Sequence, residues 1–515
     1  MQIPILPGEL WWGGHVSLGH EMPYDKRTGR TIRLEGNTEG NQSQPVFLSS
    51  KGRMLSGAEP FTAKFEGGQI SIEEDSAGVV LESPGSSLRD AHAAFVRAHC
   101  RFDGTMPERG LFAKPQFNTW IELTYDQREE RILQYAEGIV RAGYEPGVLM
   151  IDDNWQEDYG VWEFSPARFR DPAGMVRRLH DLGFVVLLWV CPFVSPDSVT
   201  ARELSKAGFL IRDGGNGDKV LWSVTDRYPA IVRWWNGASA VLDLGNPDAA
   251  AWFRSQLDRL RSVYGVDGFK FDAGDAEFYR GPLAFFQENW GPNDHTRAFA
   301  ALAAEYPWSE LRACWKLGGY PVAQRLRDKL HRWEDLRLLI PQMGILGLLG
   351  HPFACPDLIG GGEYQSFLGR ESLDQELVVR WAQCSALMPM MQFSAAPWRA
   401  LDSTHAALCL EAARLHERFA PRILELAHHA AQTGEPILRL LAWQYPDMPQ
   451  AAAATDQFLL GPDILVAPAL EASMRNRRVV LPPGSWMSDR GENFEGPAEI
   501  FVETPLDRLP FFELR

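Results

Sequence analysis

The chain has 515 residues, of which 45% are hydrophobic and 23% are charged, a balance typical of a globular protein. Because single hydrophobic cores stop growing near roughly 250–300 residues, we expect two or three domains. The formal net charge of −16 argues against a nucleic-acid partner, since such a surface repels phosphates unless a basic patch offsets it.

The start of the chain, MQIPILPG, has neither a basic segment nor a long apolar run, and no other segment approaches the roughly 18 apolar residues of a membrane span. We therefore expect a cytoplasmic protein with no membrane partner, and the sequence leaves a homo-oligomer open. No CxxC pair and no cysteine–histidine spacing typical of zinc is present, so we expect no metal. The cysteines, which we expect to be buried free thiols, are Cys100, Cys191, Cys314, Cys355, Cys384 and Cys409.

Residues 1–110 alternate polar and apolar side chains in short runs separated by turn residues, which predicts a β-sandwich. The segment 63–73 is the clearest case, because Gly67 and Gly68 separate two alternating runs and so predict a hairpin. Residues 86–108 predict a linking segment, helical or extended.

Residues 111–420 repeat a strand followed by a helix, the pattern of a parallel α/β architecture, and predict a (β/α)8 TIM barrel. The segment 208–247 is rich in Gly, Trp and turn residues, so we interpret it as an insertion after the third barrel strand. We expect barrel strands at Phe117–Leu123, Gly147–Asp152, Phe184–Val190, Gly268–Asp272, Leu311–Lys316, Leu326–Leu330, Phe353–Leu358 and Leu387–Phe393.

Residues 421–515 lose this alternation. Runs at 458–467, 478–481, 498–502 and 509–514 predict strands, with Pro-Gly turns between them. A small C-terminal β-domain is expected there.

Asp272 ends an apolar strand and is followed by small residues, which is where a barrel enzyme places its catalytic groups. Lys270 would help to keep this carboxyl ionised, as a nucleophile requires. The alternative is an aspartate that caps the following helix. Lys270 could instead form a Schiff base with a carbonyl substrate, which would make the protein a lyase.

Asp328 is the second candidate carboxylate. A pair of carboxyl groups flanking one glycosidic bond is the machinery of glycoside hydrolysis, and a separation of roughly 5–5.5 Å retains the configuration of the sugar. The neighbours Arg325, Arg327 and Lys329 would lower the pKa of Asp328, which does not suit a general acid. The alternative is a surface salt bridge.

Asp152 and Asp153 follow a third apolar strand, at Gly147–Ile151. Carboxylates in this place can each accept hydrogen bonds from two sugar hydroxyls. A divalent cation is the alternative, but no further acidic or histidine ligand lies nearby in the sequence.

Several motifs together resemble glycoside hydrolase family 31, within it the subgroup of the myogenesis-regulating glycosidase and bacterial α-galactosidases. The segment KFDAGD at 270–275 resembles the nucleophile motif of that subgroup, where most of the family has Trp at the position of Lys270. Its acid/base motif RxxDK is matched by 325–329, and its GxPFxxPDxIGG motif by GHPFACPDLIGG at 350–361. The resemblance covers nearly the whole chain and implies the same order of sandwich, barrel and C-terminal β-domain.

The resemblance also implies roles for single residues. Asp272 becomes the nucleophile and Asp328 the acid/base, while Arg312 stands at the family's sugar-binding arginine, sixteen residues before Asp328. Trp12 lies in a sandwich loop expected to reach the site, and Trp235 at the position of a pocket tryptophan. Together with the two acidic residues at 152–153, the predicted substrate-binding residues are Trp12, Asp152, Asp153, Trp235, Lys270, Arg312, Trp315 and Arg325.

From these observations we predict an exo-acting, retaining α-glycosidase without a cofactor, with a small α-linked oligosaccharide or glycoside as its substrate and an α-galactoside as the favoured one. An α-glucoside or a modified α-glycoside is the alternative substrate. A catalytically silent homologue that only binds sugar is the alternative class.

Overall fold

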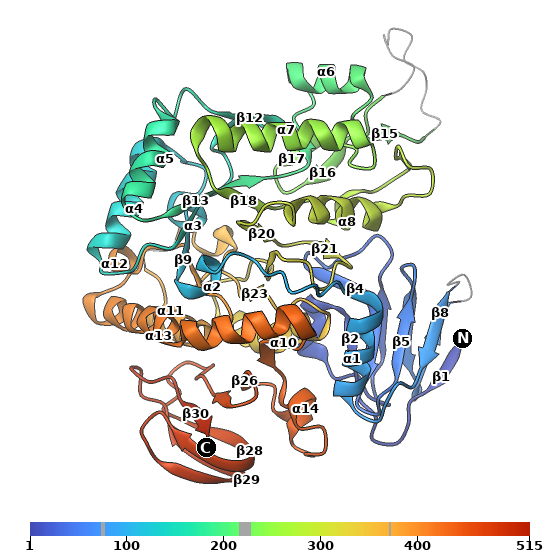
Figure 1. The fold of residues 1–515 in the computed structure, drawn as a ribbon, viewed down its shortest axis with the longest axis vertical. Helices are drawn as coiled ribbons and strands as arrows, with labels where there is room; N and C mark the ends of the chain where they lie inside the picture. Colours follow the sequence, from blue (N-terminus) through green and yellow to red (C-terminus); the bar gives the residue numbers. More distant parts are fainter. Residues whose placement is uncertain (74–77, 216–227, 370–371) are drawn as a thin grey trace.

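The computed structural model describes residues 1–73, 78–215, 228–369 and 372–515. It contains an N-terminal pair of sheets, a central TIM barrel and a C-terminal sheet, which follow one another in the blue-to-red order of Figure 1. The predicted fold class is confirmed.

Two antiparallel sheets form the N-terminal part and enclose a shared core, in which the ring of Phe47 contacts those of Phe61 and Phe65. The predicted hairpin is present, with Gly67 and Gly68 between its two strands. The first sheet has the order β1 (Gln2–Pro4), β7 (Gln69–Ile72), β6 (Thr62–Glu66), β3 (Arg30–Arg33). The second has the order β2 (Trp11–His15), β4 (Gln42–Ser49), β5 (Met54–Gly57), β8 (Val79–Glu82), and helix α1 (Leu88–His99) follows it.

Eight parallel strands form a nearly closed barrel, with helices around it (Figure 1). The loop after β23 reaches the other end strand through a backbone hydrogen bond of 2.9 Å from Ile359 N to Gln392 O in β24. The strand order is β23 (Ala354–Cys355), β22 (Ala323–Arg325), β20 (Ser309–Leu311), β18 (Gly268–Phe271), β13 (Val185–Val190), β10 (Val148–Ile151), β9 (Gln116–Asn118), β24 (Gln392–Phe393). The longer helices of this part are α4 (Glu129–Arg141), α5 (Pro172–Asp181), α7 (Pro247–Tyr264), α8 (Pro292–Ala303), α10 (Leu339–Leu348), α11 (Gln375–Ala386) and α13 (Ser403–Thr433).

Several of the predicted strand bounds were wrong in detail, since the strands expected at 353–358 and 387–393 are confined to 354–355 and 392–393, and three others are shifted or cut short. The strand expected at 326–330 lies at 323–325, the one expected at 311–316 ends at Leu311, and the one expected at 117–123 gives way to helix α3 (Trp120–Leu123). The reason is that several buried barrel positions are polar, among them Glu310, Gln324 and Gln392. These side chains interrupt the apolar runs by which strands are recognised in a sequence.

The predicted insertion at 208–247 contains β16 (Val232–Trp234) and β17 (Gly237–Val241), which form a hairpin. The hairpin joins β14 (Phe193–Val194), which lies between β13 and the insertion, in a sheet of the order β14, β17, β16. Residues 216–227 of the expected insertion lie outside the described residues.

The C-terminal part is one antiparallel sheet. Helix α13 continues through residue 421, the predicted start of this domain, so the exact division remains a proposal. The sheet has the order β25 (Leu438–Arg439), β26 (Phe458–Leu460), β27 (Ile464–Val466), β30 (Phe511–Leu514), β28 (Asn476–Ser488), β29 (Asn493–Glu503).

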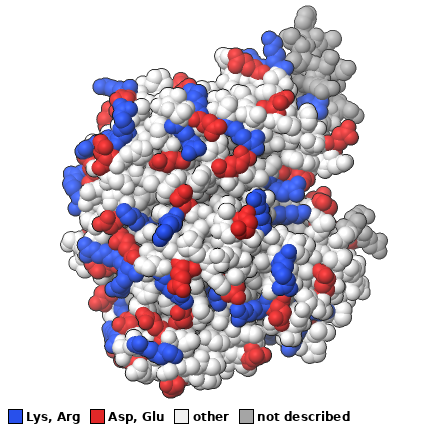
Figure 2. Space-filling model, viewed as in Figure 1, with Lys and Arg blue, Asp and Glu red and all other residues white. Residues whose placement is uncertain are grey.

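The face seen in Figure 2 carries acidic and basic side chains interspersed with one another, without a broad basic surface. No described helix is both long and apolar enough to cross a membrane.

Candidate active site

A cavity of about 590 Å³ opens at the carboxyl ends of the barrel strands. Asp152, Asp272 and Arg312 each follow directly on a strand, β10, β18 and β20, and Asp328 lies three residues after β22. This is the end of a TIM barrel at which catalytic groups gather. The lining residues are Asn37, Glu39, Gly40, Trp120, Tyr125, Asp152, Asp153, Trp189, Trp235, Lys270, Asp272, Asp275, Glu277, Phe278, Arg312, Arg327, Asp328, Glu363, Tyr364 and Gln365.

Asp272 is fixed by three hydrogen bonds to its carboxylate. Arg312 Nε (2.8 Å) and the backbone N–H of Ala273 (2.8 Å) donate to Oδ1, and Trp189 Nε1 (3.0 Å) donates to Oδ2. Ala273 has φ of 58°, a left-handed conformation that costs energy for a residue other than glycine. The sharp turn after β18 therefore aims the carboxylate into the cavity.

The charges around Asp272 keep it ionised. Burial alone would raise its pKa, but the cations of Arg312, Lys270 and Arg325 outweigh burial and hold the pKa well below its ordinary value. A carboxylate that is held in its ionised form is available as a nucleophile.

Arg312 is itself clamped by the protein. Its Nη1 and Nη2 donate to the two oxygens of Asp275 at 2.7 and 2.6 Å, and Nη1 also donates to Gly40 O at 2.6 Å. Glu277 in turn accepts from the backbone N–H groups of Thr38 and Gly40. The loop at 37–40 of the N-terminal sandwich is thereby held at the mouth of the cavity.

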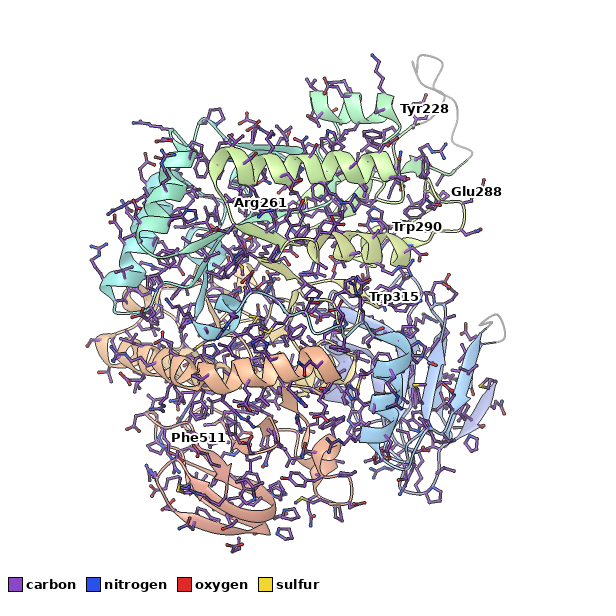
Figure 3. The ribbon with its side chains drawn as sticks, viewed as in Figure 1. Tyr228, Arg261, Glu288, Trp290, Trp315 and Phe511 are labelled. Carbon is purple, nitrogen blue, oxygen red and sulfur yellow. The ribbon has the colours of Figure 1, made fainter. Side chains whose placement is uncertain are left out.

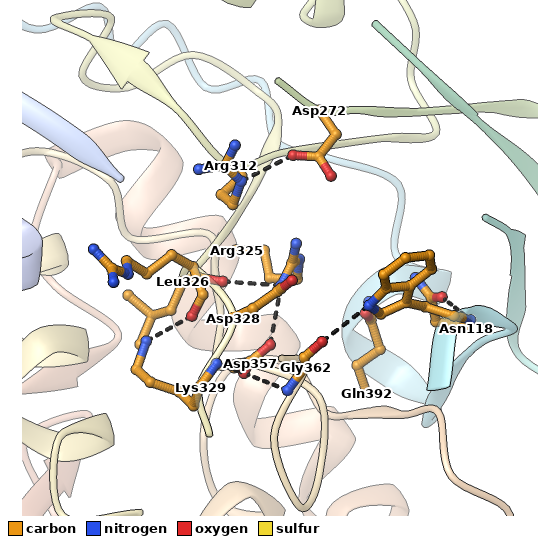
Figure 4. Close-up of polar contacts among 12 residues, drawn as sticks. Asn118, Asp272, Arg312, Arg325, Leu326, Asp328, Lys329, Asp357, Gly362 and Gln392 are labelled. Atoms are coloured by element: carbon orange, nitrogen blue, oxygen red, sulfur yellow. Dashed lines mark hydrogen bonds and ion pairs between the residues drawn. The ribbon is translucent and has the colours of Figure 1, made fainter. Parts of the chain in front are cut away.

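Asp328 is held by fewer contacts. Arg325 Nη1 donates to its Oδ1 at 2.7 Å, and the same nitrogen donates to Asp357 Oδ1 at 3.0 Å (Figure 4). Asp357 also accepts from the backbone N–H groups of Lys329 and Gly362, so it fixes both loops beside Asp328. A Cβ atom at Gly362 would lie 2.8 Å from Asp328 Oδ1, so this position needs glycine.

The pKa of Asp328 is set by opposing effects. Burial raises it, the cations of Arg325 and Lys270 lower it, and the negative charge of Asp272 raises it; the net direction is downward. The Asp328 side chain is 35% exposed, whereas that of Asp272 is 11% exposed. The carboxyl group of Asp328 is therefore still partly hydrated, and a ligand that fills the cavity would remove this hydration.

Lys270 and Asp152 form a buried ion pair, with Lys270 Nζ 2.6 Å from Asp152 Oδ2 and both side chains 4% exposed. Both residues line the cavity. The pair offers a donor and an acceptor next to one another, an arrangement suited to a hydroxyl group.

Of the predicted substrate-binding residues, the structure brings Asp152, Asp153, Trp235, Lys270 and Arg312 to this cavity together with the two predicted catalytic aspartates. The structure does not bring the other three, Trp12, Trp315 and Arg325, to the lining of this cavity.

Arg325 is 1% exposed and is not among the lining residues, because its side chain is taken up by Asp328, Asp357 and Glu310. Trp12 faces a small cleft near Gly19 and Pro341 instead of the cavity.

Trp315 is in β21 (Cys314–Trp315), which pairs with β4, and it lies where the sandwich meets the barrel in Figure 3. Its backbone thus joins the sandwich to the barrel, and its side chain is buried.

No role was predicted from the sequence for Trp189, Asp275, Glu277 or the loop at 37–40. Asp275 belongs to the recognised KFDAGD segment, so its place next to the nucleophile motif was a usable signal. The loop at 37–40 carries no comparable signal, because only the folding of the sandwich against the barrel brings it to the cavity. Among the described residues, no group of three or more His, Cys, Asp or Glu side chains could hold a metal ion.

Comparison with known proteins agrees with this architecture. A family model described as the glycosyl hydrolases family 31 TIM-barrel domain matches residues 110–426, and one described as the family 31 C-terminal domain matches residues 434–513. The myogenesis-regulating glycosidase of Mus musculus is 34% identical over 432 residues, which are 82% of this chain and 59% of that protein. The α-xylosidase XylQ of Lactiplantibacillus pentosus is 23% identical over 515 residues, 92% of this chain and 63% of that protein.

Among solved structures, a family 31 dextranase of Flavobacterium johnsoniae complexed with glucose superposes with a TM-score of 0.83 at 20% identity, covering 100% of this chain and 66% of that one. This chain is thus shorter than these relatives and spans about 60% of the two curated proteins. Since the two family models together match well over half of its residues, the chain belongs to glycoside hydrolase family 31.

Proposed function

We propose that this chain is an exo-acting, retaining α-glycosidase that prefers α-galactosides. The observation that carries the proposal is the pair Asp272 and Asp328, which line one cavity at the ends of two strands separated in the sheet only by β20. Two carboxyl groups acting on one ring are what glycoside hydrolysis requires.

In the first step Asp272 attacks the anomeric carbon while Asp328 donates a proton to the leaving oxygen. A sugar in the cavity displaces the water that reaches Asp328, and the loss of hydration adds to the burial that already raises the pKa of this residue. Substrate binding thus favours the protonated form that a general acid needs.

In the second step the same residue acts as a base. The glycosyl ester at Asp272 carries no charge, so the negative charge that raised the pKa of Asp328 is gone. The pKa of Asp328 falls accordingly, and the carboxylate can accept a proton from the water that attacks the ester. The protonation state of Asp328 thus alternates between the two steps.

The exo character is supported by the burial of the Lys270–Asp152 pair. Both residues line the cavity and each is 3% exposed, so the part of the lining that they form is buried. A terminal sugar would reach this pair, with the remainder of the substrate directed outwards past Trp235, which is 48% exposed.

The preference for galactosides rests on the subgroup that the KFDAGD segment resembles, in which Lys270 replaces the Trp of most of the family. An α-glucoside or another α-glycoside is the second candidate, because the matched relatives include an α-xylosidase and a dextranase. Galactose and glucose differ only in the orientation of the hydroxyl at C4. The Lys270–Asp152 pair would therefore have to bind this hydroxyl in a different orientation in each case.

A panel of aryl α-glycosides tests this proposal. We expect release from the α-galactoside, with the α-anomer of the free sugar appearing first in proton NMR spectra. Release from the glucoside but not the galactoside would overturn the preference, and a β-anomer as first product would overturn retention. Sugar binding without any release would identify a silent homologue.

A further inference from the structure

We infer that Asp153 is a positioning residue that ties the hairpin of β16 and β17, and with it Trp235, to the rim of the cavity, and that it does not bind the sugar. The inference deepens the proposed function, on which its kinetic part rests. It replaces the role in substrate binding that the sequence suggested for Asp153.

The carboxylate of Asp153 is saturated by donors from the protein. Oδ1 accepts from the backbone N–H of Asn154 (2.6 Å) and from Gln156 Nε2 (3.1 Å), and Oδ2 accepts from Tyr159 OH (2.9 Å) and Asn236 Nδ2 (2.6 Å). A carboxylate has about four acceptor positions, so none is left for a sugar hydroxyl. The residue is 2% exposed, which agrees with an internal role.

Asn236 is the residue through which this carboxylate reaches the hairpin. Besides Asp153, its Nδ2 donates to Tyr159 OH at 2.7 Å, and its Oδ1 accepts from Tyr125 OH at 2.9 Å. Both ends of its amide are thus held by side chains that precede the insertion. The pairing of β17 with β14 fixes the base of the hairpin, and the Asp153–Asn236 contact fixes its tip.

Trp235 lies directly before Asn236 in this tip and lines the cavity. Its ring is 5.3 Å from the guanidinium of Arg312 and 5.4 Å from the ring of Phe278. Since the adjacent residue is anchored, the indole has a fixed place above the arginine that holds Asp272. Aromatic rings in such a place suit the apolar face of a sugar.

The arrangement allows an exchange experiment. Asp153→Asn places an amide donor against the donor of Asn236, and Asn236→Asp places two carboxylates against each other. Combining the two substitutions reverses the donor and the acceptor but keeps the contact, the net charge and the hydrogen bonds that Tyr159 and Tyr125 can make. Asp181→Asn, which removes an exposed carboxylate at the end of α5, is the control for the charge.

We expect each single variant to raise KM for the aryl glycoside about tenfold or more, because a buried polar group loses its partner, and to change kcat much less. Amide hydrogen exchange in residues 232–241 should become faster in both. The double variant should return KM to within about threefold of the wild-type value and restore the slow exchange, and Asp181→Asn should change neither.

A direct contact with the sugar would give the opposite pattern: KM would stay high in the double variant, and Asp153→Asn would leave the exchange at 232–241 unchanged. Either result overturns the inference. If Asp153→Asn does not fold, Asn236→Ala tests the same contact from the hairpin side, and unchanged exchange there would contradict it. A wild-type protein that hydrolyses nothing would refute the proposed function alone, since the exchange measurement needs no substrate.

Discussion

The two sides of the cavity hold their carboxylates in different ways. Asp272 follows a strand without any intervening residue, accepts three hydrogen bonds and is nearly sealed from water. Asp328 lies in a loop, accepts a side-chain hydrogen bond from Arg325 alone among the described residues, and has a side chain that is 35% exposed. This difference in hydrogen bonding and exposure matches the roles proposed for the two residues, a nucleophile and an acid/base.

A nucleophile stays ionised until it reacts, whereas an acid/base residue changes its protonation state twice in each cycle. The cations around Asp272 hold it in the ionised form that a nucleophile needs. Asp328, as acid/base, needs a pKa that responds to the arrival of the sugar and to the loss of the charge on Asp272. The cavity thus combines a rigid side with an adaptable one.

Asp272→Asn tests the rigid side and should have the largest effect. The amide keeps the size of the side chain but cannot attack, so kcat should fall by about 10⁴-fold or more. Thermal unfolding should change little, because Arg312 keeps its contact with Asp275. Activity within tenfold of the wild type, compared with Asp181→Asn as control, would show that Asp272 is not the nucleophile.

Asp328→Ala tests the adaptable side. Turnover of substrates with poor leaving groups should fall by about 10²- to 10⁴-fold, while cleavage of a glycosyl fluoride, which needs no proton, should fall much less in its first step. Rates on both kinds of substrate measure the difference. Equal losses would contradict the role of an acid.

Asp153 sharpens the comparison, because it is as buried as Asp272 but pairs with no Lys or Arg of the part of the chain that the structure describes. Burial first, and then the charge of Asp152, raise its pKa to about 6. As the pH rises from about 4 to about 6, the unfolded chain ionises at this position before the folded one does. The wild type should therefore lose up to about 3 kcal/mol of unfolding free energy relative to Asp153→Asn across this window.

Unfolding temperatures of both proteins, measured between pH 4 and pH 6.5, provide the check. The hydrogen bonds that Asp153→Asn loses lower its unfolding temperature at every pH. The test is therefore whether the difference between the two unfolding temperatures varies with pH. A difference that does not vary with pH would mean that the carboxyl ionises normally in the folded protein.

Gly362→Ala perturbs only the adaptable side and should have the smallest effect. The new Cβ would crowd Asp328 Oδ1 at 2.8 Å and Asp357 Oδ1 at 2.7 Å, so kcat/KM should fall about tenfold. Gly29→Ala is the matched control, because no atom lies within 4 Å of its Cβ position. Unchanged kcat/KM in Gly362→Ala would mean that Asp328 does not need its present position.

The sequence predicted the features that depend on neighbouring residues. Asp272 and Asp328 were found because each lies in a recognisable local segment, and the order of sandwich, barrel and C-terminal sheet follows from local alternation of side chains. Strand β22 was misplaced because Gln324 and Arg325, although buried, resemble loop residues.

The features that depend on contacts between distant segments could not be predicted. The saturation of Asp153 by Asn236 and the placement of the loop at 37–40 join residues far apart in the chain. Trp315 shows the converse, since it was predicted to bind the substrate but its pairing with β4 directs it elsewhere.

Trapping of the covalent intermediate tests the central claim most directly. Incubation with a 5-fluoro-α-galactosyl fluoride, followed by proteolysis and mass spectrometry, should locate the sugar on Asp272, and Asp272→Asn should remain unlabelled. Stable attachment to a different carboxylate, in protein that hydrolyses the aryl galactoside, would contradict the account.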